Sequence, residues 1–196
     1  MKFITIDIEG DARVKQRNQL LFPKPPHYDP ETRLWCCSVC WNGKVKTFVC
    51  KLPPTTRILP DGSHTGSFHL SNTKVPKQYK TVQIVEIKEY TEFLQEISKI
   101  LAFAKNTGYA VYFKGYGKYN YDKDMLNHIF NKFGISTYGI DNMVNAHKYT
   151  IGKWPKTHEQ VGLYEKKPNQ EFICDGIKHN IEDTLQLYNI MNDITR

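Results

Sequence analysis

The chain has no apolar stretch that approaches the roughly 20 residues needed by a membrane-spanning helix. Its N-terminus lacks the uninterrupted apolar core of a signal peptide, because Asp7 and Glu9 lie inside its apolar run. No internal repeat is visible in the 196 residues. We therefore expect a cytoplasmic protein without a membrane partner, formed by a single domain over residues 1–196.

Acidic side chains are in the minority, with 20 Asp and Glu against 27 Lys and Arg, which gives a net charge of +7. This excess favours a polyanionic partner, most simply nucleic acid, although a solvated lysine-rich surface would give the same count. Aromatic residues are abundant at 13%, and such rings can stack on bases. The 40% of apolar and 24% of charged residues exclude an intrinsically disordered chain.

Cysteine is present five times, an odd number, and four of the five fall close together, at Cys36, Cys37, Cys40 and Cys50. In an intracellular protein we expect these thiols to be reduced. Cys37 and Cys40 have the spacing of zinc ligands, which leaves a zinc-stabilised binding module as an alternative. The first three cysteines lie in a segment that has the composition of a strand, where cysteine is a good core residue.

Hydrophobic patterning predicts an α/β fold. Apolar and β-branched runs predict strands over residues 3–8, 34–41, 44–52 and 109–113, and a short strand within 135–141. Residues 82–87 suit either a short strand or the start of a helix. Apolar residues three and four apart predict helices over residues 89–105, 121–133 and 177–194. Long loops are expected at about 11–32 and 53–80.

The sheet is expected to be mixed. Asn42-Gly43 is a strong hairpin signal, so the second and third strands should be antiparallel neighbours. The alternation of helix, strand and helix after residue 89 favours parallel pairing for the later strands. The sequence therefore predicts a sheet whose first three strands are antiparallel and whose later strands are parallel, with helices at its flanks.

Two carboxylates interrupt the end of the first strand. Side chains two residues apart point to the same face of a strand, so Asp7 and Glu9 should project together. Two buried carboxylates repel each other, and a divalent cation such as Mg²⁺ or Mn²⁺ removes that cost. Gly10 then leaves room for a ligand to approach. An isolated Asp-x-Glu is common, so the pair needs partners elsewhere in the chain.

Three further residues supply those partners. Asp122 falls where a loop meets a helix, directly after a predicted strand, and could otherwise be an ordinary acidic residue at a helix N-terminus. His179 and Asp183 are four residues apart in the last helix, so they share a face and could otherwise be an exposed pair. Four carboxylates from three elements can hold two divalent cations. His179 could then accept a proton from an attacking water at neutral pH.

At these residues the chain resembles the DEDD superfamily of 3′–5′ exonucleases, and most closely its histidine-containing DEDDh branch. The resemblance covers nearly the whole chain and is carried by three motifs, Ile6-Asp7-Ile8-Glu9-Gly10, Gly117-Lys118-Tyr119-Asn120-Tyr121-Asp122-Lys123-Asp124-Met125-Leu126 and His179-Asn180-Ile181-Glu182-Asp183-Thr184-Leu185. It implies an RNase H-like fold and two Mg²⁺ or Mn²⁺ ions held by Asp7, Glu9, Asp122 and Asp183. It also implies hydrolysis that releases nucleoside 5′-monophosphates, with these carboxylates and His179 as catalytic residues.

The third motif departs from the family in its spacing. In the histidine branch the last Asp usually follows the His by five positions, whereas here the gap is four, as in the tyrosine branch. His158 and His147 are therefore alternative bases, and Asp175 could compete for a metal if the last helix starts late.

The loop before the third predicted helix combines glycine, lysine and tyrosine. Its basic residues could follow phosphates and its rings could stack a terminal base, so we expect nucleic-acid contacts from Lys114, Tyr116, Lys118, Tyr119 and Asn120. A single-stranded 3′ end, most simply of DNA, is the expected substrate. The alternative from another class is a catalytically inactive nucleic-acid-binding or inhibitor protein on the same fold. The sequence leaves the oligomeric state and the choice between DNA and RNA open.

Overall fold

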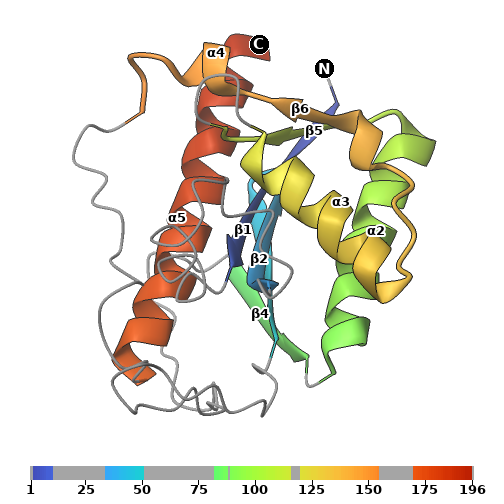
Figure 1. Ribbon diagram of the computed structural model, residues 1–196. Helices are drawn as coiled ribbons and strands as arrows, with labels where there is room; N and C mark the ends of the chain where they lie inside the picture. The colour runs from blue at the N-terminus through green and yellow to red at the C-terminus, as the bar shows by residue number, and fades with distance from the viewer. Residues whose placement is uncertain are drawn as a thin grey trace, which may run out of the picture.

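The computed structural model describes residues 2–10, 34–50, 82–87, 89–115, 120–154 and 170–195, except for the side chains of residues 170–175 (Figure 1). The loops expected at about 11–32 and 53–80 lie almost wholly outside these ranges. The description that follows therefore concerns a sheet and the helices packed on it.

A six-stranded mixed sheet forms the centre of the molecule. Its strands have the order β4-β3-β2-β1-β5-β6. β1, β2 and β3 are antiparallel neighbours, whereas β4 pairs in parallel with β3, β5 with β1, and β6 with β5. The predicted mixed sheet is thus confirmed, and residues 82–87 form a strand. The strands are β1 (Phe3–Gly10), β2 (Leu34–Trp41), β3 (Lys44–Cys50), β4 (Val82–Ile87), β5 (Ala110–Phe113) and β6 (Met143–Asn145).

The turn between β2 and β3 has the conformation that its sequence predicts. Asn42 and Gly43 both have positive φ, at 50° and 71°. Two successive residues with positive φ are typical of a type I′ turn, whose twist matches that of a hairpin. This turn fixes the register in which Trp41 pairs with Lys44.

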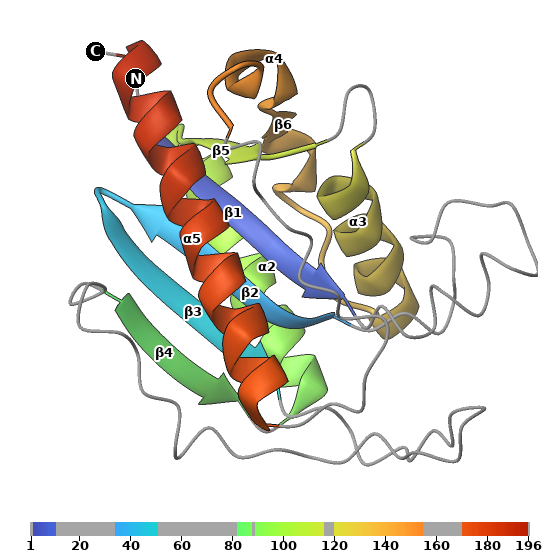
Figure 2. The ribbon, with the colours of Figure 1, turned by 90° about the vertical axis from the view of Figure 1, so that its left-hand side faces the viewer.

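Helices cover both faces of the sheet. α2 and α3 pack on one face, and α5 runs across the other (Figures 1 and 2). Ile4, Ile6 and Ile8 of β1 lie in the core beneath α2 and α3, so the alternate residues of β1 face α5. The helices are α2 (Tyr90–Thr107), α3 (Tyr121–Phe133), α4 (His147–Thr150) and α5 (Gln170–Thr195), with a 3₁₀ turn η4 (Ile140–Asn142).

Two predicted elements differ from those observed. The strand expected within 135–141 is wrong, because the strand at this edge is β6, preceded by η4. Gly139, just before η4, has a φ of 98° and lies so close to the backbone of Leu101 that a side chain would not fit. The conformation of this segment therefore depends on a contact that is distant in sequence. The last helix begins at Gln170, whereas the sequence predicted a start at about residue 177. Gly176, just before that position, has a low helix propensity.

α5 buries a broad stripe of apolar residues. Ile181, Ile190 and Met191 are buried, while Leu185 and Tyr188 pack against the core only in part. Ile177 and Leu187 are buried as well. No helix among the described residues combines the length and the apolar character required to cross a membrane.

Candidate active site

β1 and α5 position the first carboxylates between them. Asp7 points to the face that α5 covers, and its Oδ2 accepts a hydrogen bond from Asn180 Nδ2 at 2.6 Å. Two residues earlier, Thr5 Oγ1 donates to the backbone oxygen of Thr184 at 3.0 Å. The pairing of β1 with β2 shifts register between Glu9 and Gly10. Such an irregularity redirects side chains at the end of a strand, here beside the predicted carboxylate pair.

Asp122 is the second residue of α3, and its environment differs from that of an ordinary acidic residue at a helix start. Asp122 is only 6% exposed to solvent. The Oδ2 atom is buried, and no hydrogen-bond donor among the described residues contacts it. A carboxylate that merely complemented the helix dipole would keep its water shell. Asp122 is therefore directed inward.

His179 and Asp183 lie one turn apart on α5. His179 Nε2 is 3.8 Å from Asp183 Oδ2, and the two side chains are 18% and 14% exposed. An exposed i,i+4 pair would be far more accessible to solvent. The pair therefore lies on a largely buried part of α5.

The pKa shifts show that the carboxylates lie together. Burial, the charge of Glu9 and the charges of Asp122 and Asp183 raise the pKa of Asp7 well above its usual range, against the lowering effect of the Asn180 hydrogen bond. Burial and the charge of Asp183 raise the pKa of Asp122 to about 8, against the lowering effect of Lys114. The four predicted carboxylates from β1, α3 and α5 thus lie near one another, with Asp122 buried and Asp7, Glu9 and Asp183 partly buried.

This cluster fits a divalent cation in its chemistry, although it is not a closed ligand set. Carboxylate oxygens are the ligands that Mg²⁺ and Mn²⁺ prefer, and the buried Oδ2 of Asp122 is an acceptor without a donor among the described residues. Within the described part of the chain, however, no three carboxylate, histidine or cysteine side chains are arranged to coordinate one ion. Binding would have to draw these oxygens closer together.

Lys114 lies in this cluster rather than at its periphery. Thr5 of β1 pairs with Tyr112 of β5, so Lys114, two residues beyond Tyr112, follows β5 at the level and on the face of Asp7. Its Nζ is 4.0 Å from the centroid of the Trp154 ring. Burial lowers the pKa of Lys114, and the charges of Asp183, Asp7 and Asp122 oppose that shift. The sequence predicted Lys114 as a phosphate contact but did not indicate that it would lie among the carboxylates.

The rest of the predicted nucleic-acid loop is described only at its ends. Asn145 connects these ends, since its Oδ1 accepts from Gly115 N at 3.2 Å and its Nδ2 donates to Asn120 Oδ1 at 3.1 Å. Asn120 is therefore held by a neighbour within the protein. Tyr116, Lys118 and Tyr119 lie outside the described residues.

Two asparagines of the site were missed by the sequence analysis. Asn180 is fully buried, holds Asp7 and accepts a hydrogen bond from Cys36 Sγ at 3.5 Å. A polar residue at an inward position of a helix was its only signal. Asn145 also fixes the start of α4, because its Oδ1 accepts from His147 N at 2.9 Å. It carried no signal for its contact with the β5–α3 connection, because Gly115 and Asn120 are distant from it in sequence.

The alternative site residues are not brought to the cluster by any described contact. His147 is the first residue of α4 and is partly buried. No described contact links its side chain to the four carboxylates. His158 and the side chain of Asp175 lie outside the described residues.

The cysteines do not form the zinc pair that their spacing allowed. Cys37 packs in the core beneath α2 and α3, whereas Cys40 packs on the α5 side of the sheet. Cys36, Cys37 and Cys40 are free thiols, and all four described cysteines, these three and Cys50, are buried. Side chains three residues apart on a strand point to opposite faces, so Cys37 and Cys40 cannot share an ion.

No protein-family model matches the chain, and no curated protein is significantly similar to it. A function must therefore be argued from the residues and their arrangement. The carboxylate cluster, with His179 and Lys114 beside it, is the candidate active site of the described structure.

Proposed function

We propose that the protein is a metal-dependent 3′–5′ exonuclease with an RNase H-like fold, acting on the 3′ end of single-stranded nucleic acid, most simply DNA. One observation carries the proposal. Asp7, Glu9, Asp122 and Asp183 come from three separate elements, and burial together with the charges of the other three raises the pKa of Asp7. Placing like charges together where water is partly excluded costs stability, and a site for divalent cations explains why such a cluster exists.

The four carboxylates would hold two Mg²⁺ or Mn²⁺ ions, which supply the positive charge that stabilises the attacking and leaving oxygens of a phosphodiester. His179 lies beside Asp183 and accepts the proton of the attacking water. The water oxygen bonds to phosphorus as the bond to the 3′ oxygen breaks, and that oxygen takes a proton from solvent. The product is a nucleoside 5′-monophosphate.

Lys114 has two roles in this proposal. In the protein without metal its Nζ offsets part of the negative charge of the cluster, since Asp183, Asp7 and Asp122 all act on it. With substrate bound, the same ammonium group donates to a non-bridging phosphate oxygen. The contact with the Trp154 ring restricts where the Nζ can lie.

The test is a time course on 5′-labelled single-stranded DNA and RNA, with Mg²⁺, Mn²⁺ or EDTA. We expect a ladder that shortens from the 3′ end and is abolished by EDTA and by Asp122→Asn. Asp124→Asn is the matched control, because Asp124 is exposed on the same helix. Full activity of Asp122→Asn would contradict the proposed site. His179→Ala should lower the rate by about 10²–10⁴-fold, and an unchanged rate would transfer the role of base to His147 or His158.

A nucleic-acid-binding or inhibitor protein without catalysis is the second candidate. It is favoured by one observation, namely that no three potential ligands among the described residues are arranged around a common point. Salt-sensitive binding of oligonucleotide with no cleavage in any metal would establish it.

A further inference from the structure

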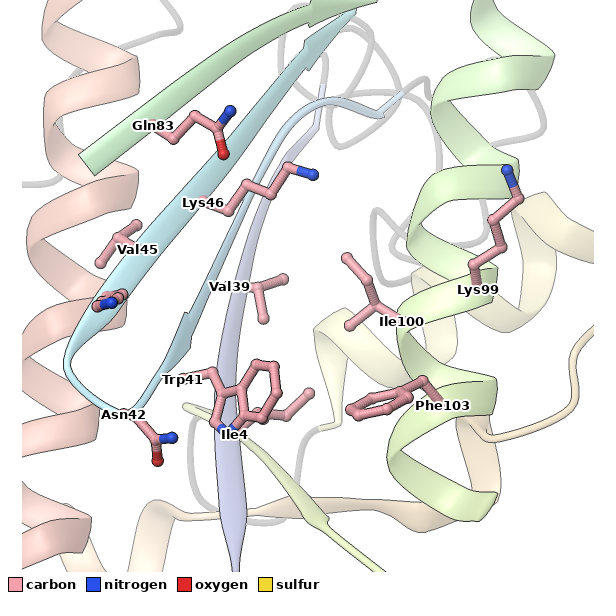
Figure 3. A pocket seen from close by; sticks show the side chains of 11 residues that line it. Ile4, Val39, Trp41, Asn42, Val45, Lys46, Gln83, Lys99, Ile100 and Phe103 are labelled. Carbon is pink, nitrogen blue, oxygen red and sulfur yellow. The ribbon is translucent and has the colours of Figure 1, made fainter. Parts of the chain in front are cut away.

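A groove of about 670 Å³ lies between the sheet and α2, away from the carboxylate site (Figure 3). It is lined by Ile4 near the start of β1, whereas Asp7 and Glu9 lie at the other end of that strand and Asp7 points to the opposite face. The proposed exonuclease chemistry makes no use of this groove. It therefore needs an explanation of its own.

The walls of the groove are aliphatic and one end is aromatic. Ile4 and Val39 of the sheet lie opposite Ile100 of α2 (Figure 3). At one end the rings of Trp41 and Phe103 lie together, with centroids 5.7 Å apart. These two residues are 42% and 44% exposed, which is unusual for large apolar side chains gathered in a concave surface.

The rim of the groove is positively charged. Lys44 and Lys46 are both exposed and line the groove from β3, and Lys99 lines it from α2. No Asp or Glu occurs among the described residues that line the groove. Lys99 Nζ pairs with Glu96 Oε1 at 2.5 Å, and Lys46 Nζ lies 4.9 Å from the centroid of the Phe48 ring. The ion pairs of the described chain involve neither Lys44 nor Lys46, and the ring contact of Lys46 does not neutralise its charge, so both lysines can meet an anionic ligand.

We propose that this groove binds a short acidic segment of a partner protein, in which an aromatic or large aliphatic side chain lies next to Asp or Glu. The apolar side chain would enter between Ile100 and Val39 and stack against Trp41 and Phe103, while the carboxylates would meet Lys44 and Lys46. Exclusion of water from an aromatic anchor and charge complementarity at the rim are the usual components of such a site.

A peptide fits these walls better than a nucleic acid does. A base that entered between Val39 and Ile100 would lose water from its polar edges, and these aliphatic side chains offer no hydrogen bonds in exchange. Asn42 and Gln83 are the amide side chains among the described residues that line the groove. A phenyl or isobutyl group has no such edges. The proposal is independent of exonuclease activity, so Asp122→Asn should bind the peptide as the wild type does, and failure of one proposal leaves the other standing.

The test uses a fluorescein-labelled peptide, Asp-Glu-Asp-Leu-Phe, titrated with the full chain and followed by fluorescence anisotropy. We expect saturable binding that weakens with added salt. Phe103→Ala should weaken it about tenfold or more, and so should the charge reversal Lys44→Glu/Lys46→Glu. Lys132→Glu, an exposed lysine on α3, is the matched control and should bind normally. All three variants change only exposed positions, and circular dichroism checks that each variant is folded.

Three results would overturn the proposal. The first is the absence of saturable binding, and the second is equal binding by wild type and both groove variants. The third is displacement of the peptide by oligothymidylate together with loss of oligothymidylate binding in Phe103→Ala, which would make the groove a nucleic-acid surface. A peptide whose Phe is replaced by Ala should bind at least about tenfold more weakly if the aromatic anchor is correct.

Discussion

Asp122 couples the stability of the metal-free protein to pH. Burial and the charge of Asp183 raise its pKa to about 8, whereas in the unfolded chain it ionises near its ordinary value of about 3.8. Unfolding therefore releases a proton between these two values, so the contribution of Asp122 to stability is present at low pH and is lost as pH rises toward 8. We expect the melting temperature in EDTA to fall across this window.

Asp122→Asn should reduce that dependence, because the amide cannot ionise. At pH 8 each kcal/mol of unfolding free energy that the substitution adds would raise the melting temperature by about 2–4 °C. Thermal unfolding in EDTA at pH 5 and pH 8 measures the effect, and Asp124→Asn serves as control. The prediction fails if wild type and Asp122→Asn show the same change in melting temperature between the two pH values.

Lys114 should have opposite effects on metal binding and on catalysis. Its positive charge competes with a cation for the same carboxylates, so Lys114→Met should bind Mn²⁺ more tightly in calorimetry. The same variant should hydrolyse substrate more slowly, because it lacks the donor to the phosphate. Lys153→Met, at an exposed position next to Trp154, controls for a general change in charge. Weaker Mn²⁺ binding in Lys114→Met would contradict its placement as a competing cation.

At the scale of elements, a buried polar contact seats α5 on the sheet. Thr5 Oγ1 donates to the backbone oxygen of Thr184, one residue from Asp183. Thr5→Val keeps the shape and removes the donor, so it should cost about 1 kcal/mol of unfolding free energy in urea titrations. Because the same contact fixes the turn of α5 that carries Asp183, Mn²⁺ affinity should fall as well. A lower unfolding free energy with unchanged Mn²⁺ affinity would mean that Thr5 has only a structural role.

The elements that could be predicted from sequence are those whose signals are local. β1 to β3 followed from β-branched runs and from the Asn42-Gly43 turn, and α2 and α3 followed from their apolar spacing. The turn at Gly139 could not be predicted, because its conformation depends on the distant backbone of Leu101. The early start of α5, at Gln170, could not be predicted, because Gly176 has a low helix propensity.

At the scale of the whole molecule, the same distinction applies to the site. Asp7, Glu9, Asp122 and Asp183 could be singled out as candidates because acidic residues within or beside apolar segments stand out in a sequence. The role of Asn180 could not be predicted, because it depends on a hydrogen bond to Asp7, which is 173 positions away in the sequence. The place of Lys114 beside Asp7 likewise needed the parallel pairing of β5 with β1. Chemical types are visible in a sequence, whereas their distances depend on the fold.

The cysteines of the sheet should report on opening of the whole molecule. Cys36, Cys37, Cys40 and Cys50 are fully buried, and burial raises the pKa of the Cys36 and Cys37 thiols well above its ordinary value. A thiol reagent needs the thiolate and access to it, so we expect these four thiols to react only when the sheet unfolds. Their modification rate should follow the unfolding rate as urea is raised.

Mass spectrometry after pulses of a thiol reagent measures this, with Cys36→Ala and Cys40→Ala to assign the slow sites. Added zinc should not protect Cys37 or Cys40, because they lie on opposite faces of the sheet. Protection by zinc together with one tightly bound zinc per chain would instead support a metal-stabilised module. Rapid modification of all four thiols in the native protein would mean that the sheet opens far more readily than its buried core predicts.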